Sequence, residues 1–204
     1  MGIAVQLHRC FWCNNTPIYR DYHDSEWGFP VNDDTNLFEK ICLEGFQSGL
    51  SWLTILKKRE NFRLAFNGFD IESVARFSQK DVERLMSDPG IVRHLGKVEA
   101  VIHNARCAEK LLDSKSSLAA YFWEFEPDFA SRPQVYNLET LKALTQSKES
   151  IALSKDLKQR GWKFVGPITM YAFMQALGLV NDHEEGCYVR EAALAARRQF
   201  QISI

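Results

Sequence analysis

The segment from Leu37 to Trp52 constrains the fold of this chain most strongly. When it is wound at about 100° per residue, its apolar positions form one broad face, as in an amphipathic helix. These positions are Leu37, Phe38, Ile41, Cys42, Gly45 and Phe46. The positions opposite are polar: Glu39, Lys40 and Gln47. Glu44 is the exception, because its angle places a carboxylate at the edge of the apolar face. Burying it is costly unless a partner hydrogen-bonds it or a ligand needs it, so Glu44 is either a satisfied structural carboxylate or a recognition or acid–base group in a pocket.

Helical signals continue along the rest of the chain. The helix around Glu44 has Asp34 or Thr35 as its cap and ends at Gly49, which leaves Leu50 on a tight turn before a new helix at 52–66. Further helices are expected after Asp70 and at 78–88, 93–112, 118–125, 168–177 and 191–199, and another contains Ile151, Leu153 and Leu157 and stops at Gly161. Residues 1–33 and 127–137 read as irregular. No alternating strand pattern exceeds four residues, so the predicted class is all-α.

Length and composition limit the class of protein further. The 204 residues fit one unit, with an approximate helical core at 34–165 and terminal segments at 1–33 and 166–204. We expect no membrane span, and the first ten residues lack the apolar core of a signal peptide. Five cysteines without a dense framework favour a reducing, cytoplasmic location. The net charge of −1 argues against an extended nucleic-acid-binding surface but leaves room for a local one.

Cysteine and histidine residues near the two ends of the chain form a candidate metal site. His183 and Cys187 are separated by three residues, a common half-site for zinc. The N-terminal half-site is open on spacing alone, because Cys10 can act with His23 or with Cys13. A metal bound by both halves would hold together two terminal segments. The alternative is ordinary cysteines and hydrogen-bonded histidines.

The segment from Gly161 to Gly166 reads as a hairpin between two helices. One helix ends on a glycine, a short hydrophobic turn follows, and a second glycine precedes Pro167 at the start of an apolar helix. Backbone amides in such a turn can bind a phosphate without reading sequence, and Lys163 would add positive charge. A turn between two helices that has no role in DNA binding would have the same glycine spacing.

Aromatic residues gather in the N-terminal segment, interleaved with the candidate metal ligands. They are Trp12, Tyr19, Tyr22 and Trp27, with Trp52 farther along. Aromatic side chains most often build a core, but few aliphatic partners are present here. Aromatic walls combined with the Glu44 carboxylate would suit a flat, cationic ring.

Six motifs, in order along the chain, closely resemble those of the type I 3-methyladenine DNA glycosylases. They are Cys10-Phe-Trp12, Tyr22-His-Asp-Ser-Glu-Trp-Gly28, Leu43-Glu-Gly-Phe-Gln-Ser-Gly-Leu-Ser-Trp52, Leu56-Lys-Lys-Arg-Glu-Asn61, Arg160-Gly-Trp-Lys-Phe-Val-Gly166 and Gly178-Leu-Val-Asn-Asp-His183. The resemblance implies a helix-hairpin-helix glycosylase fold with one structural zinc joining the N- and C-terminal segments. By position, the implied zinc ligands are Cys10, His23, His183 and Cys187. The implied base pocket consists of Trp12, Tyr22, Trp27, Glu44 and Trp52, of which Glu44 and Tyr22 are the catalytic candidates. The implied DNA contacts are Leu50, as a wedge, and Gly161, Lys163 and Gly166.

The resemblance implies an enzyme that flips 3-methyladenine out of double-stranded DNA and releases it by hydrolysis. No lyase step is expected, and the expected form is a monomer with free 3-methyladenine as its product. Asp182 is interpreted as a structural residue. Two alternatives remain, a non-catalytic hairpin module that binds DNA phosphates and a zinc-stabilised protein that binds a small cation.

Overall fold

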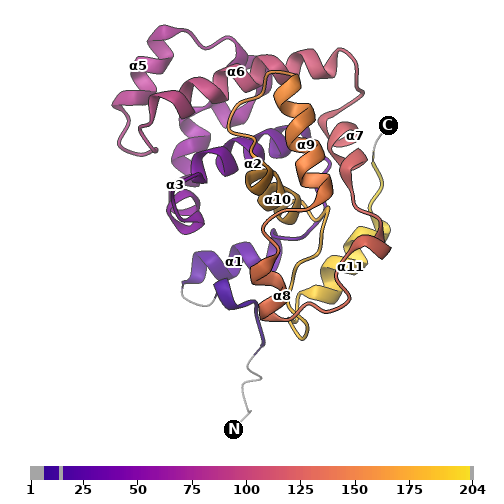
Figure 1. Cartoon of the computed structure of the whole chain (residues 1–204). Helices are drawn as coiled ribbons and strands as arrows, with labels where there is room; N and C mark the ends of the chain where they lie inside the picture. The colour runs from indigo at the N-terminus through magenta and orange to yellow at the C-terminus, as the bar shows by residue number, and fades with distance from the viewer. Residues whose placement is uncertain (1–6, 14–15, 203–204) are drawn as a thin grey trace.

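The computed structural model describes residues 7–13 and 16–202 and consists of helices joined by loops (Figure 1). The α-helices are α1 (Pro17–Ser25), α2 (Asp34–Gln47), α3 (Trp52–Ala65), α4 (Ile71–Ala75), α5 (Gln79–Ser87), α6 (Leu95–Leu112), α7 (Leu118–Phe122), α8 (Leu138–Ala143), α9 (Lys148–Gln159), α10 (Pro167–Ala176) and α11 (Arg190–Gln199). Short 3-10 helices are η1 (Phe11–Cys13), η2 (Asn67–Phe69), η3 (Trp123–Phe125) and η4 (Phe129–Ser131). No strand occurs in these two ranges, which confirms the all-α prediction.

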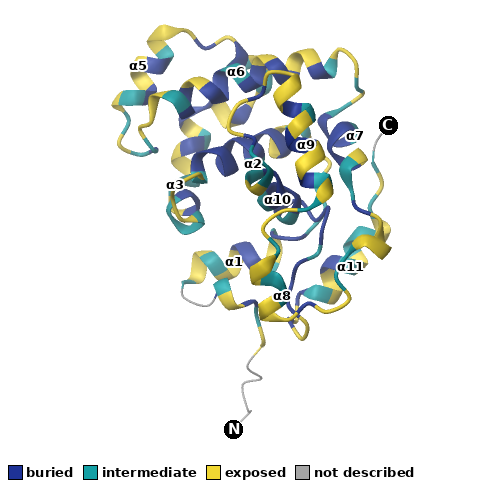
Figure 2. Ribbon diagram, in the orientation of Figure 1, coloured by how far each residue is buried: buried dark blue, intermediate teal, exposed yellow. Residues whose placement is uncertain are grey.

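Helix α2 lies at the centre of the larger core and packs against α3, α6, α7 and α10 (Figure 2). Its N-cap is Asp33, whose side chain accepts a hydrogen bond from the backbone N–H of Asn36, rather than the expected Asp34 or Thr35. The prediction that Glu39 faces solvent is wrong, since it is 6% exposed. Arg63 of α3 compensates the buried charge through two contacts of 2.8 Å to the Glu39 carboxylate. This partner explains why α2 is buried on almost every side.

Helices α9 and α10 form the expected hairpin, which is fastened to α6. The side chain of Asn104 donates to the carbonyl of Lys163 at 3.0 Å and accepts from its backbone N–H at 2.8 Å. His103 Nε2 lies 2.8 Å from the carbonyl oxygen of Gly161. Trp162 is buried and closes the end of α9 through its backbone N–H. The later turns of α10 are buried, as its apolar sequence predicts.

The prediction that residues 1–33 are irregular is wrong in part, because Pro17–Ser25 forms α1. Pro17 occupies the first turn, where its missing N–H is not needed. Helix α8 was also not predicted, and none of its residues is buried. The described part of the chain does not include residues 1–6, 14–15 and 203–204. The first of these ranges belongs to the N-terminal segment that was predicted to lack a signal-peptide core.

The N-terminal segment lies beside the loop that precedes α11, at the end of the molecule that carries α1, α8 and α11 (Figure 1). The backbone N–H of Tyr188 donates to the carbonyl of His8 at 3.0 Å. The Glu184 side chain accepts from the backbone N–H of Phe11 at 2.6 Å. In the described ranges, no helix has both the length and the apolar character to cross a membrane.

Candidate functional site

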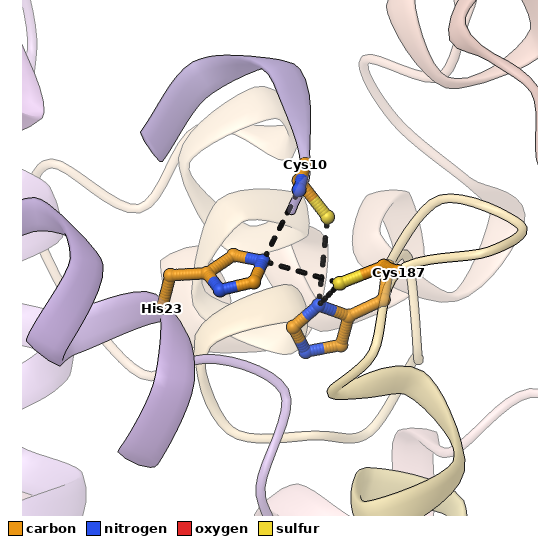
Figure 3. Close-up of side chains that lie close together, drawn as sticks. Cys10, His23 and Cys187 are labelled. Carbon is orange, nitrogen blue, oxygen red and sulfur yellow. Dashed lines mark hydrogen bonds between the residues drawn. The ribbon is translucent and has the colours of Figure 1, made fainter. Parts of the chain in front are cut away.

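A buried cluster of two cysteines and two histidines joins the terminal segments. Cys10 precedes η1, His23 lies on α1, and His183 and Cys187 come from the loop before α11 (Figure 3). One ligand atom from each residue lies within 4.8 Å of the others, and all four residues are buried. The structure therefore brings together the four residues that the family resemblance implied and forms a group that could hold a metal ion.

Three sulfur–nitrogen distances within the cluster fit tetrahedral coordination. Cys10 Sγ lies 3.5 Å from His183 Nδ1, and Cys187 Sγ lies 3.5 Å from His23 Nε2 and 3.6 Å from His183 Nδ1. A tetrahedral zinc with ordinary Zn–S and Zn–N bonds would separate its sulfur and nitrogen ligands by about 3.6 Å. The donor set of two thiols and two imidazoles is also one that zinc prefers.

Groups around the cluster orient both imidazoles. His23 Nδ1 lies 2.8 Å from the Asp24 carboxylate, which leaves Nε2 toward the thiols. His183 Nε2 lies 3.0 Å from the carbonyl oxygen of Trp27, so that Nδ1 of the same ring faces the two thiols. Gly28 permits this approach, because its φ is +84° and an added Cβ would lie 2.9 Å from His183 Nε2.

Cys13 is the cysteine that spacing alone could not exclude. It is buried, and its thiol contacts the carbonyl oxygen of Cys10 at 3.2 Å instead of joining the cluster. The 3-10 turn of η1 separates the two side chains, so the choice of Cys10 depends on backbone conformation and not on the number of intervening residues.

An aromatic cavity of about 420 Å³ lies beside this cluster. It is lined by the five aromatic residues of the sequence pattern, together with Glu44: Trp12, Tyr19, Tyr22, Trp27 and Trp52. The centres of the Trp12 and Trp27 rings are 5.0 Å apart, and those of Tyr22 and Trp52 are 5.3 Å apart. All five residues predicted for the base pocket thus line one cavity. Its size suits one flat heterocycle surrounded by aromatic faces.

Glu44 differs from a satisfied structural carboxylate. It is 5% exposed and has no hydrogen-bond or ion-pair partner among the described residues. Burial raises the pKa of Glu44 to about 8, an effect that the positive charge of Lys40 partly offsets. Lys40 lies one helical turn earlier on α2, and its Nζ is 5.4 Å from the centre of the Tyr22 ring. Burial and then the negative charge of Glu44 raise the pKa of Tyr22, so its hydroxyl stays protonated.

Asp182 also lines the cavity, but both of its oxygens are occupied. One forms an ion pair with Arg132, and the other accepts from Tyr171 Oη at 2.7 Å and from Gln175 Nε2 at 2.8 Å. This network ties the loop after α10 to α10 itself and agrees with the interpretation of Asp182 as a structural residue.

The predicted DNA contacts lie on neighbouring exposed turns. Leu50 is 42% exposed on the turn after α2, where Gly49 has a φ of +81°. Lys97 of α6 supports this turn by donating to the carbonyls of Phe46 at 2.9 Å and Ser48 at 2.5 Å. A groove runs from Glu44 and Gln47 past Leu50 to Ile168 at the start of α10.

The hairpin residues have the exposure that a phosphate contact requires. Lys163 and Gly161 are exposed, and Gly166 is half-buried at the start of α10. The two amide contacts from Asn104 hold the backbone at Lys163, which leaves the side chain in solvent.

Several cavity residues were missing from the predicted base pocket. Tyr19 belonged to the aromatic pattern but was not assigned to the pocket. Its spacing of three residues from Tyr22 would have placed both on one face of a helix, had α1 been predicted. Four residues from α8 and the loop after it had no sequence signal: Leu141, Lys142, Leu144 and Thr145.

Comparisons with known proteins agree with this geometry. The family model described as methyladenine glycosylase matches residues 12–191. DNA-3-methyladenine glycosylase 1 of Escherichia coli strain K12 is 50% identical over 182 residues, which cover 89% of this chain and 96% of that protein. A structure of 3-methyladenine DNA glycosylase I from Staphylococcus aureus, which describes 3-methyladenine recognition, is 36% identical with a TM-score of 0.83 and covers 90% of this chain and 97% of that one. A variant of 3-methyladenine DNA glycosylase I in complex with 3-methyladenine is 36% identical with a TM-score of 0.82. The match covers 89% of this chain and 97% of that one. The chain belongs to the methyladenine glycosylase family.

Proposed function

We propose that this protein is a DNA glycosylase of base-excision repair, which flips 3-methyladenine out of alkylated double-stranded DNA and releases it by hydrolysis. One observation carries the proposal: Glu44, a buried carboxyl group without a partner among the described residues, opens into a cavity walled by aromatic rings. Such a group calls for a ligand that supplies both a hydrogen-bond donor and positive charge. The family membership and the 3-methyladenine complex of a relative support the choice of base.

The chemistry of the lesion fits the residues of the cavity. Methylation at N3 gives the adenine ring a positive charge while it is attached to DNA, and this charge weakens the glycosidic bond. The flipped ring would stack on Tyr22 and the indoles of Trp12, Trp27 and Trp52. Glu44 would accept a hydrogen bond from the exocyclic amine, and the positive ring would lower the pKa of Glu44 and favour its ionised form.

The proposed reaction needs little acid catalysis from the protein. Because the leaving base departs as a neutral molecule, no group has to protonate it. Water attacks the sugar carbon as the glycosidic C–N bond breaks, and the proton that the water loses passes to solvent. No covalent step through a lysine is involved. We therefore propose a monofunctional glycosylase whose main task is to extrude and hold the nucleotide.

We also propose that Cys10, His23, His183 and Cys187 bind one zinc ion with a structural role. The fit of the sulfur–nitrogen separations and the two oriented imidazoles support this choice. The metal would stabilise the contact between the terminal segments, which carry Trp12, Tyr22 and Trp27 of the pocket. It would take no part in the cleavage reaction.

DNA binding would use the two exposed turns next to the pocket. The hairpin from Gly161 to Gly166 would bind a phosphate through its backbone amides, with Lys163 adding charge. Leu50 would fill the space that the extruded nucleotide leaves in the base stack. The protein would act as a monomer, and its five free cysteines suit a reducing, cytoplasmic location.

The decisive experiment is excision from methylated duplex DNA, with the released bases identified by chromatography. Release of 3-methyladenine without strand cleavage is expected. Salt-dependent binding of the duplex without release of any base would replace the proposal with a non-catalytic hairpin module. Binding of the free base without binding of DNA would replace it with a protein for a small cationic ligand.

A further inference from the structure

In the aromatic cavity, the carboxyl groups are buried and the basic group is exposed. Its three carboxyl groups are buried, with Glu44 5% exposed, Asp182 3% and Glu184 9%. Lys142 of α8 is the one basic residue among the described residues that line the cavity, and it is exposed. The cavity thus has an acidic interior and a basic rim.

Lys142 is available for a ligand. It forms no ion pair within the described part of the chain, and its Nζ lies 5.2 Å from the centre of the Phe11 ring. Phe11 is itself 46% exposed and is held by the hydrogen bond from its backbone N–H to Glu184. This contact between η1 and α8 directs the ammonium group along the rim of the cavity instead of leaving it free to move through solvent.

A flipped-out nucleotide has the same arrangement of charge. Its methylated base is positive and enters the cavity, whereas its phosphates are negative and stay at the entrance. A lysine deep in the cavity would repel the positive base, but a lysine at the rim attracts a phosphate. An ammonium group is a point charge that binds phosphate without demanding a fixed orientation.

We infer that Lys142, held against Phe11, binds a phosphate group flanking the flipped-out nucleotide. This inference rests on the proposed function. It makes Lys142 different from Lys163, because the phosphate reaches Lys142 only after the nucleotide has left the base stack. Lys163, in contrast, would contact the backbone of any duplex.

The test compares Lys142→Gln with wild type on three ligands: a duplex that contains a stable abasic-site analogue, an unmodified duplex and free 3-methyladenine. One phosphate contact contributes about eightfold to affinity at 0.1 M salt through counterion release. Lys142→Gln should therefore bind the abasic duplex about eightfold more weakly, and the salt slope for that duplex should fall by about 0.9. Affinities for the unmodified duplex and the free base should stay within about twofold of wild type, and Lys142→Arg should restore binding.

Lys80→Gln is the matched control, because it removes an exposed lysine from α5, at the opposite end of the molecule from α8 (Figure 1). It should bind all three ligands as wild type does. Equal losses on both duplexes with Lys142→Gln would overturn the inference and make Lys142 a general backbone contact. A loss of free-base affinity would overturn it by placing Lys142 in the pocket, and an unchanged affinity for the abasic duplex would refute it outright.

Two further results separate this inference from the proposed function. If wild type releases 3-methyladenine but Lys142→Gln behaves like wild type, only the inference about Lys142 is wrong. If wild type releases no base, both are wrong. Borohydride trapping on DNA with a natural abasic site provides another check: a covalent adduct that Lys142→Gln abolishes would show an amine nucleophile in place of a phosphate contact.

Discussion

Replacing Glu44 with glutamine tests the central residue of the pocket, because the change removes the charge and keeps the shape. Burial raises the pKa of Glu44 from its ordinary 4.5 to about 8. The folded protein therefore holds this proton more tightly than the unfolded chain does. Between these two pKa values the contribution of Glu44 to the free energy of unfolding falls as pH rises, because folding requires the carboxyl group to take up a proton that the unfolded chain has released.

The size of this effect follows from the two pKa values. They imply a penalty on the folded state of about 1 kcal/mol at pH 5 and about 4 kcal/mol at pH 8. A buried glutamine amide without partners has its own cost, but that cost does not depend on pH. The difference in unfolding free energy between Glu44→Gln and wild type should thus shift in favour of the variant by about 3 kcal/mol from pH 5 to pH 8. Denaturant unfolding at several pH values measures this difference.

Base recognition should change in the opposite direction. Glu44→Gln should weaken binding of free 3-methyladenine by about 1–3 kcal/mol, or about 5- to 150-fold, because a carboxylate acceptor is lost. Calorimetry measures this loss. Single-turnover excision should slow without disappearing, because the charge of the lesion weakens the glycosidic bond independently of Glu44.

Glu39→Gln provides the matched control, since it changes another buried glutamate on α2. Glu39 is paired with Arg63, so this variant should lose stability while base affinity stays the same. For Glu44→Gln, intact base affinity together with abolished turnover would refute the recognition role and identify Glu44 as a general base. A loss of stability that is equal at every pH would refute the claim that burial raises the pKa of Glu44, and it would indicate a structural role for this residue.

Three other substitutions, with Cys13→Ser as the control for the first, test the remaining parts of the site. Cys187→Ser should reduce zinc content measured by elemental analysis and lower the melting temperature, because a structural metal contributes to folding, whereas Cys13→Ser should keep its metal. Lys163→Ala should weaken binding to lesion-containing and unmodified duplexes equally, about eightfold at 0.1 M salt in a titration. Asp182→Asn should lower stability by about 3 kcal/mol through loss of a buried ion pair, with unchanged single-turnover excision by the folded fraction.

Each of these expectations has a result that contradicts it. Zinc retained by Cys187→Ser and lost by Cys13→Ser would replace the proposed ligand set. A loss confined to lesion-containing DNA would move Lys163 from the backbone contact to the pocket. Undiminished stability with abolished excision would make Asp182 catalytic.

Local periodicity was enough to place α2 and the side on which Glu44 lies. The 100° rotation per residue fixes which side chains share a face, and the glycine at position 49 marks where the helix ends. The same reasoning gave the wrong exposure for Glu39, because its partner Arg63 is 24 residues away on α3. A buried ion pair formed in tertiary structure leaves no periodic signal in either helix.

The N-terminal part of the pocket was harder to predict. Helix α1 begins at Pro17, inside the segment that was predicted to be irregular, and its aromatic face is stabilised by contacts with Trp12 and Trp52 instead of by helix propensity. Helix α8 is only six residues long and has no buried residue, so it has no apolar stripe to detect. For the metal cluster, spacing left open whether Cys10 acts with Cys13 or with His23. The backbone turn of η1 keeps the Cys13 thiol out of the cluster, and His23 joins it instead.

The contrast between Glu44 and Asp182 explains how one cavity can hold two buried carboxyl groups with different roles. Asp182 has a cationic partner, Arg132, and two further hydrogen-bond donors, Tyr171 and Gln175, so its carboxylate is paired before any ligand arrives. Glu44 has no such partner in the described part of the chain, and its ionisation in the free protein is opposed by burial. In the proposed reaction a positive ring would remove that opposition, whereas ordinary adenine is neutral and would not. Each pKa unit by which the ring lowers the pKa of Glu44 corresponds to about 1.4 kcal/mol of favourable coupling between ring and carboxylate. The missing partner of Glu44 would therefore favour the methylated base over the ordinary one without any contact to the methyl group.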